Sequence, residues 1–186
     1  MCIRDSGLQT VKEEVHNLIN MASVYQLRRQ HGLPTTDMSL HLVFTGNPGT
    51  GKTMMARMMA RIYRSLDILS RGQLVEVDRS GLVAGYVGQT ALKTQKVIEK
   101  AMGGVLFIDE AYALNGKSEN DFGQEAIDTV LKAMEDHRDD LVVIVAGYTD
   151  LMDKFIHSNP GLESRFNRFL LFEDYTADEM VQIFDM

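Results

Sequence analysis

The residues with the clearest chemical meaning form a glycine-rich segment in the first third of the chain. The segment is Gly46-Asn47-Pro48-Gly49-Thr50-Gly51-Lys52-Thr53, and it matches the phosphate-loop pattern at every fixed position. Glycines let such a backbone curl until successive N–H groups point at anionic oxygens. Lys52 would then reach the β- and γ-phosphates of a nucleotide, and the Thr53 hydroxyl would ligate Mg²⁺. The alternative, a turn that only caps a helix, is disfavoured because an apolar strand precedes the segment and a helical pattern follows it.

A second segment with chemical meaning is an apolar run that ends in two acids, Val105-Leu106-Phe107-Ile108-Asp109-Glu110. Such a doublet by itself is common and mostly marks the start of a helix. Beside a phosphate loop it has a further use, because Asp109 would hold the Mg²⁺ sphere and Glu110 would polarise the water that attacks the γ-phosphate. The pairing of the two motifs therefore predicts nucleotide hydrolysis and not nucleotide binding alone.

The composition excludes several other classes of protein. The chain has 186 residues, with 19 Lys and Arg against 26 Asp and Glu, a formal net charge of -7. That length predicts one domain, and the acidic balance argues against a dedicated nucleic-acid binder. The single cysteine, Cys2, rules out an internal disulfide and favours a reducing compartment. No apolar run approaches the ~20 residues of a spanning helix. We therefore expect a cytoplasmic protein without a membrane partner.

The periodicity of apolar residues predicts how the two motifs are positioned. Short apolar runs alternate with segments of helical period, which is typical of an α/β fold whose parallel sheet is covered by helices on both faces. We expect strands at 41–45, 74–78, 105–108, 141–146 and 168–172, and helices at 11–30, 52–66, 90–102, 123–136 and 176–185.

The two ends of the chain fit this pattern less well. Residues 1–6 match nothing that follows, and we interpret them as a translated cloning or sequencing artefact. The sequence stops about ten residues into its last helical pattern, so we expect a truncated chain.

Taken in order, the motifs resemble those of AAA+ ATPases, in particular the branch that contains the red-type Rubisco activases and the stage V sporulation K proteins. The resemblance covers nearly the whole chain from residue 7. It implies a P-loop NTPase domain with a five-stranded parallel sheet over 7–175, followed by a helical lid of which 176–186 would be the start. The residues that carry the resemblance are Gly7-Leu8 with Val11-Lys12, Gly46 to Thr53, Gly85 to Thr90, Gly103 to Tyr112, Phe122 to Ala126, Ala146 to Tyr148, and Asn159 to Phe166.

The resemblance also implies an activity and a set of partners. It implies an ATP- and Mg²⁺-dependent protein remodeller that assembles as a homo-oligomeric ring, expected to be a hexamer, and pulls on a protein substrate. Gly7 and Leu8 would join the nucleotide site. Arg165 would be the finger that reaches the neighbouring subunit's nucleotide, with Arg168 as an alternative or a helper.

Tyr86 and Val87 resemble a pore loop that grips a polypeptide, and the polar stretch 115–121 would be a second channel loop. The competing interpretation of Tyr86 is a turn residue that packs on the core. One position departs from many AAA+ proteins, because Tyr148 stands where an Asn orients the attacking water. It is our sensor candidate, against the simpler interpretation of a strand-end tyrosine with a solvated hydroxyl.

Two other functions stay open at this point. One is a nucleic-acid-acting AAA+ motor or loader, against which the acidic charge and the aromatic loop argue. The other is a non-catalytic assembly module switched by nucleotide, against which the intact Lys52, Asp109 and Glu110 argue.

Overall fold

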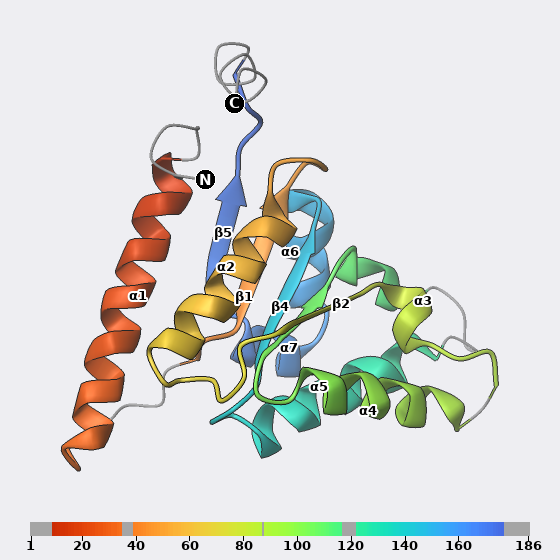
Figure 1. Cartoon of the computed structure of the whole chain (residues 1–186). Helices are drawn as coiled ribbons and strands as arrows, with labels where there is room; N and C mark the ends of the chain where they lie inside the picture. Colours follow the sequence, from red (N-terminus) through yellow and green to blue (C-terminus); the bar gives the residue numbers. More distant parts are fainter. Residues whose placement is uncertain (1–8, 35–38, 87, 117–121, 177–186) are drawn as a thin grey trace.

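The central feature of the computed structural model is a five-stranded, all-parallel sheet with strand order β2-β3-β4-β1-β5 (Figure 1). The strands are β1 (Leu42–Gly46), β2 (Leu74–Val77), β3 (Val105–Ile108), β4 (Val142–Gly147) and β5 (Phe169–Phe172). The structure describes residues 9–34, 39–86, 88–116 and 122–176. The sequence predictions for 1–8 and for the lid start beyond 176 lie outside these residues.

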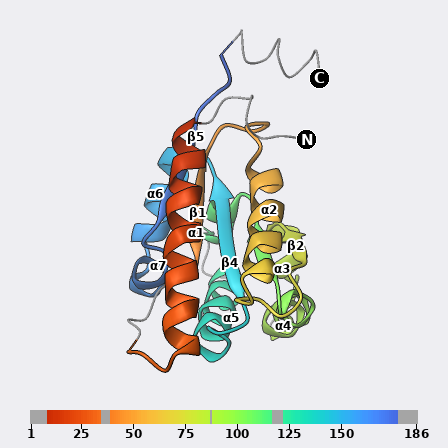
Figure 2. The ribbon, with the colours of Figure 1, turned by 60° about the vertical axis from the view of Figure 1, so that its left-hand side comes forward.

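Helices cover both faces of the sheet, which makes three layers (Figure 2). On one face lie α1 (Gln9–Gln30) and α2 (Lys52–Ser65). The helical elements on the other face are α3 (Arg79–Leu82), α4 (Gln89–Ala101), the 3-10 turn η1 (Ala111–Leu114), α5 (Gly123–Asp136), α6 (Thr149–His157) and α7 (Pro160–Arg165). No helix of the described segments is long and apolar enough to cross a membrane.

The core is divided in two by the sheet, as a central parallel sheet requires. Side chains of β1, β3 and β4 point alternately to the two faces and are buried on both. On the face of α1 and α2, the ring of Phe44 lies 4.9 Å from that of Phe172 and 6.4 Å from that of Phe107. On α1, Val11, Val15, Leu18 and Ala22 recur at steps of four and three and are buried against the sheet, whereas Tyr25 is partly exposed.

The five predicted strands and the predicted helices at 11–30, 52–66, 90–102 and 123–136 are confirmed, with ends that differ by at most two residues, whereas the predicted helix at 176–185 lies outside the described residues. The prediction missed four short helical elements, α3, η1, α6 and α7. For α3 and α7 the sequence contains residue types that favour a helix start. The Asp78 side chain caps α3 by accepting a hydrogen bond from the Gly81 N–H. The Asn159 side chain caps α7 by accepting one from the Gly161 N–H, and Pro160 is the first residue of that helix. Short helices carry too few turns for apolar periodicity to show them.

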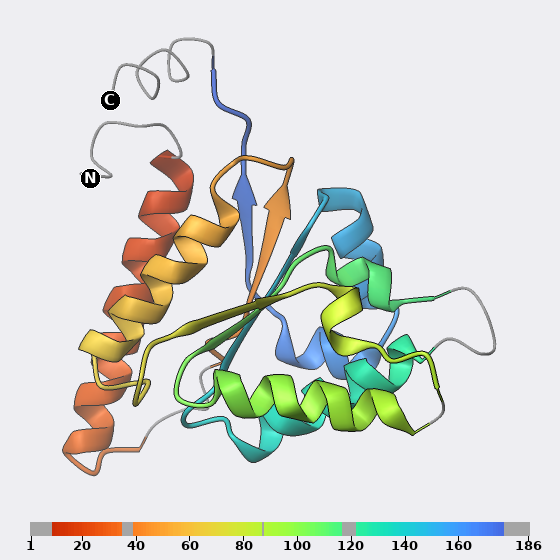
Figure 3. The same ribbon diagram turned by 45° about the vertical axis from the view of Figure 1, so that its right-hand side comes forward.

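The topology brings three loops to one edge of the sheet. Since all strands run parallel, their carboxyl ends meet at the same edge (Figure 3). The loops after β1, β3 and β4 follow neighbouring strands there. The first contains the phosphate loop and the second contains the acid doublet, so the fold places the two predicted motifs side by side.

A buried histidine precedes β1 at the opposite edge of the sheet. His41 is 8% exposed, its ring lies 6.1 Å from that of Phe166, and its Nδ1 accepts a hydrogen bond of 3.0 Å from the Val143 N–H. An accepting Nδ1 carries no proton, so the fold holds a neutral imidazole. Burial, together with the smaller effect of the Arg165 charge, lowers the pKa of His41 from 6.5 to about 4.

We predict that His41 makes the folded state sensitive to acid. Between pH 6.5 and about 4 the unfolded chain binds the proton and the folded chain does not, so His41 leaves stability intact above pH 6.5 and removes it as the pH falls. The difference between 6.5 and about 4 corresponds to at most ~3 kcal/mol, at ~1.4 kcal/mol per pH unit. Urea denaturation from pH 7 to 4 measures it. His41→Asn, whose amide oxygen can accept from Val143, should lose less stability over this range; equal losses would contradict the prediction.

Candidate functional site

The two predicted motifs line one cavity of about 340 Å³ at the carboxyl edge of the sheet. The phosphate loop and the start of α2 form one wall, and residues that follow β3 and β4 form the other. The lining residues are Gly46, Pro48, Gly49, Gly51, Lys52, Thr53, Met54, Asp109, Glu110, Gly147 and Tyr148. Lys52, Asp109 and Glu110, far apart in the sequence, therefore face a common space that a nucleotide's phosphates can enter.

The curl of the phosphate loop depends on backbone conformations that favour glycine. Gly46, Gly49 and Gly51 have φ values of 141°, 79° and 91°. At Gly46 there is also no room, because a Cβ atom would lie 2.2 Å from the carbonyl oxygen of Phe172. Inside the loop, the Thr50 hydroxyl donates to the Asn47 carbonyl over 2.8 Å. The loop is thus fixed by its own backbone and by contact with β5.

Lys52 opens α2 and extends its ammonium group back along the loop. Its Nζ donates to the carbonyl oxygens of Gly46 and Asn47 over 2.9 and 2.6 Å. Burial lowers the pKa of Lys52, and the carboxylates of Asp109 and Asp174 oppose this effect. A partly desolvated ammonium between carbonyl groups is positioned to bind an anion at the mouth of the loop.

The acid doublet has a backbone that separates its two side chains. Glu110 adopts the left-handed conformation, with φ 48° and ψ 44°, which is uncommon for a residue with a side chain. Its N–H donates to Asp109 Oδ1 over 3.0 Å, and the Asp109 N–H continues the sheet by donating to Val77 over 2.8 Å. Asp109 is therefore tied to the strand end, while Glu110 stays exposed at the cavity and is able to contact water.

The oxygen atoms around Thr53 suit a hard divalent cation. The Thr53 hydroxyl lies 3.3 Å from Glu76 Oε1, and Asp109 lines the same cavity. Hydroxyl and carboxylate oxygens are the ligands that Mg²⁺ prefers, with phosphate oxygens and water completing its octahedron. Within the described residues no three His, Cys, Asp or Glu side chains group as a metal site. The residues present therefore fit a cation that takes further ligands from the nucleotide.

Two tyrosines flank Glu110 on the side of β4. Tyr148 is 40% exposed at the cavity, and its ring centroid lies 6.3 Å from that of Tyr112. Tyr112 packs against Gly147 so closely that a Cβ there would lie 2.6 Å from its ring. Burial raises the pKa of Tyr112, and the neighbouring Glu110, Tyr148 and Asp109 raise it further. The sensor candidate Tyr148 thus lines the same cavity as the acid doublet.

Sequence reasoning missed the segment that follows β5. Asp174 accepts from the Asn47 side-chain amide through both carboxylate oxygens, at 3.0 and 2.8 Å, and the Tyr175 hydroxyl donates to the Thr50 carbonyl over 3.3 Å. The one feature that could have indicated Asp174 and Tyr175 is their position directly after β5, the strand that pairs with β1. It also missed Glu76 and Met54, which motif matching does not address.

The remaining predicted site residues lie elsewhere. Arg165 ends α7, a helix that lies near the amino ends of the strands (Figure 1), and it does not line the cavity of its own chain. Arg168 precedes β5, and its guanidinium lies 3.7 Å from the sulfur of Met21 on α1. Tyr86, between α3 and α4, is 73% exposed, so the core-packing alternative is wrong for it. Gly7, Leu8, Val87 and most of 115–121 lie outside the described residues.

Comparison with known proteins decides the family. The family model described as "ATPase family associated with various cellular activities (AAA)" matches residues 42–174. The chain belongs to the AAA family. Membership implies that the chain binds nucleotide, in keeping with the lining of the cavity, and it bears out the resemblance drawn from the motifs.

The relatives include proteins of both kinds that the motifs indicated. Protein CbxX (chromosomal) of Cupriavidus necator is 51% identical over 97% of this chain. The chloroplastic ribulose bisphosphate carboxylase/oxygenase activase of Cyanidioschyzon merolae is 50% identical over 95%, and stage V sporulation protein K of Bacillus subtilis is 44% identical over 95%. The chain spans 57%, 61% and 55% of the lengths of these three relatives.

We predict that Lys52→Ala weakens binding of Mg²⁺·ATP by more than about tenfold, because a charged hydrogen bond is worth roughly 1.5–3 kcal/mol. Isothermal titration calorimetry measures the dissociation constant. Lys93→Ala is a matched control, since the Lys93 ammonium also donates to two backbone carbonyls, those of Ser80 and Val83, but does not line the cavity. Equal affinities for the Lys52 variant and the parent chain would contradict the assignment.

Proposed function

We propose that this protein hydrolyses ATP with Mg²⁺ and uses the energy to remodel a protein substrate, working as a homo-oligomeric ring. The observation that carries the proposal is the single cavity shared by the phosphate loop and the acid doublet. Membership of the AAA family supports the same activity. A ring of six subunits and a cytoplasmic location belong to this proposal.

In this proposal each cavity residue has a distinct role. The N–H groups of the loop and the Lys52 ammonium bind the β- and γ-phosphates. Thr53 and Asp109 hold the Mg²⁺, which supplies charge neutralisation on the phosphates. Glu110 accepts a proton from the attacking water or orients it, since its carboxylate is exposed at the cavity. Tyr148 contacts the water or the γ-phosphate from the end of β4.

The proposal assigns Arg165 to the cavity of the neighbouring subunit. Phosphoryl transfer develops negative charge, and an arginine supplied from outside can contribute 10³–10⁵ in rate. Arg165 lies away from its own cavity on a half-exposed helix end, which suits a residue that acts across a boundary. Arg168 contacts α1 in its own chain, so we assign it a supporting role at most.

The exposed Tyr86 supports the assignment of a substrate-gripping loop. An exposed aromatic ring next to Gly85 and Gly88 can contact an extended polypeptide without selecting its sequence. A relative is named an activase of ribulose bisphosphate carboxylase/oxygenase and another a sporulation protein. Either kind of substrate, Rubisco or a sporulation component, is compatible with the motifs of this chain.

The two alternative functions are less well supported. A net charge of -7 argues against a nucleic-acid motor or loader. The presence of Lys52, Asp109 and Glu110 around one cavity argues against a module that binds nucleotide without hydrolysing it.

We predict that Glu110→Gln binds Mg²⁺·ATP with near-parental affinity and hydrolyses it at least about 100-fold more slowly. The amide preserves the shape of the carboxylate but cannot accept a proton, and general base catalysis contributes roughly 10²–10⁴. Calorimetry measures binding, and phosphate release under saturating ATP measures the rate. Glu163→Gln, at an exposed glutamate on α7, is the control. A variant at position 110 with parental turnover would show that Glu110 has only a structural role.

We also predict that two inactive variants restore hydrolysis when they are mixed. Arg165→Ala keeps an intact cavity and lacks the finger, whereas Glu110→Gln lacks the base and keeps the finger. In mixed rings some boundaries pair an intact cavity with an intact finger, so phosphate release should exceed that of either variant alone. Light scattering of each variant checks assembly first. Without recovery between variants that assemble, Arg165 acts inside its own subunit and the shared-site mechanism fails.

A further inference from the structure

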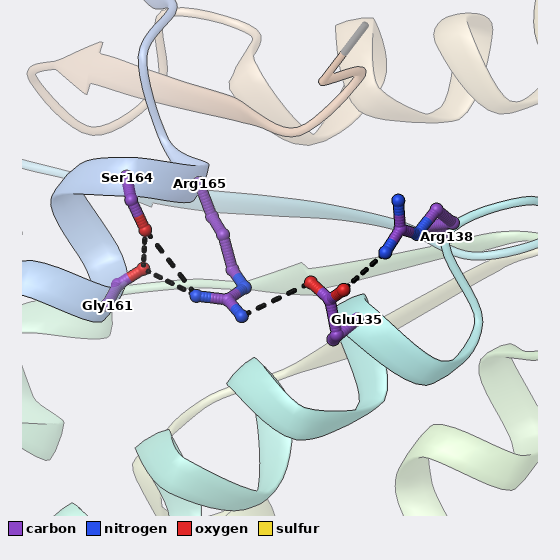
Figure 4. A network of polar contacts seen from close by, with 5 residues as sticks. All are labelled: Glu135, Arg138, Gly161, Ser164 and Arg165. Carbon is purple, nitrogen blue, oxygen red and sulfur yellow. Dashed lines mark hydrogen bonds and ion pairs between the residues drawn. The ribbon is translucent and has the colours of Figure 1, made fainter. Parts of the chain in front are cut away.

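The Arg165 side chain is held by its own chain, as Figure 4 shows. Its Nη1 lies 3.3 Å from the Gly161 carbonyl oxygen and 3.5 Å from the Ser164 hydroxyl, both in α7. Its Nη2 lies 3.4 Å from Glu135 Oε2, near the end of α5. Two contacts thus come from the helix that carries Arg165, and the third is an ion pair with a different helix.

Glu135 is shared between two arginines. Its other carboxylate oxygen, Oε1, pairs with the guanidinium of Arg138, one turn further along the chain (Figure 4). The side chain of Glu135 is 54% exposed and that of Arg165 is 29% exposed. An exposed pair at this distance is weak and screened by salt, so another anion can replace it.

A neutral side chain, that of His41, also lies near Arg165. The guanidinium is close enough to the buried His41 for its charge to lower the pKa of that imidazole. His41 is neutral in the fold because its Nδ1 accepts a hydrogen bond from Val143. Of the carboxylates in the described segments, Glu135 is the one that the structure pairs with Arg165.

We propose that Glu135 is a positioning residue that holds the Arg165 guanidinium on its own subunit and competes for it with the neighbouring subunit's nucleotide, while Arg138 weakens this hold by sharing the carboxylate. The inference rests on the proposed function, in which Arg165 acts across the boundary. A phosphate and a carboxylate offer a guanidinium the same type of charged hydrogen bond, so one replaces the other. The developing charge of the γ-phosphoryl group withdraws Arg165 from Glu135 during hydrolysis.

The proposal predicts opposite changes in kcat for variants of Glu135 and of Arg138. Glu135→Gln removes the competitor and should raise kcat between about 1.5-fold and fivefold, the range expected for loss of an exposed ion pair. Arg138→Gln leaves Glu135 to Arg165 alone and should lower kcat by a similar factor. In this proposal Arg138 acts on Arg165 through the Glu135 carboxylate, so the double variant should match Glu135→Gln. The KM for ATP should stay constant throughout, because in this proposal Arg165 leaves Glu135 only as charge develops on the γ-phosphoryl group.

The measurement is steady-state phosphate release by the assembled protein at low ionic strength, with light scattering and melting temperature recorded for every variant. Asp136→Asn, with the same change of charge at the next residue of α5, is the matched control and should leave kcat unchanged. High salt should raise the kcat of the parent protein towards that of Glu135→Gln, because salt screens the ion pair between Glu135 and Arg165. An unchanged or lower kcat for Glu135→Gln, loss of its assembly, or a rise in kcat for Arg138→Gln overturns the proposal.

A separate variant distinguishes failure of this inference from failure of the proposed function. If Arg165→Ala hydrolyses ATP at the parental rate, the finger assignment is wrong, and the inference about Glu135 falls with it. If Arg165→Ala is slow and Glu135→Gln matches the parent protein, the finger stands and only the inference is wrong. In the Arg165→Ala background, Glu135→Gln should not change the residual rate, whereas a merely structural role for Glu135 would change it.

Discussion

The site depends on the close approach of β1 and β5 at their carboxyl ends. Gly46 is paired in register with Phe172, and a side chain at Gly46 would collide with the Phe172 carbonyl. The close packing of β1 against β5 fixes the position at which the phosphate loop begins. It also places the residues that follow β5 next to that loop. Asp174 and Tyr175 contact Asn47 and Thr50 as a result. The phosphate loop is therefore in direct contact with the segment that follows β5.

Charge around the phosphate loop is already partly balanced without any ligand. Asp109 and Asp174 both raise the pKa of Lys52 against the opposing effect of burial. A triphosphate entering the loop brings anionic oxygens to donors that Asp174 and the loop carbonyls already engage. Binding is thus an exchange of partners, and its free energy is smaller than the sum of the new contacts. Asn47, which the motif leaves unspecified, is one of the donors in this exchange.

The sequence predicted the sheet and the centre of the site because both leave regular patterns. Buried parallel strands read as apolar runs, and the phosphate loop has fixed spacing, so Lys52 and Asp109 could be placed on one sheet edge. Contacts between side chains distant in sequence leave no such pattern. Glu76 beside Thr53, Asp174 beside Asn47 and Glu135 beside Arg165 follow only from strand order and helix packing. The left-handed backbone of Glu110 was equally invisible, since glutamate does not favour it.

The inventory of charges at the cavity explains why hydrolysis should require assembly. Of the described residues that line it, Lys52 is the one cation, whereas Asp109 and Glu110 bring two carboxylates. Phosphoryl transfer is catalysed mainly by positive charge placed around the γ-phosphoryl group, and Mg²⁺ held by Asp109 supplies only part of it. The arginines that the motifs indicated lie on other elements of the same chain, and Arg165 is engaged there by Glu135. In the proposed mechanism, a subunit thus supplies the residues that bind the phosphates and orient water, and a neighbour's guanidinium supplies the positive charge that the breaking bond requires.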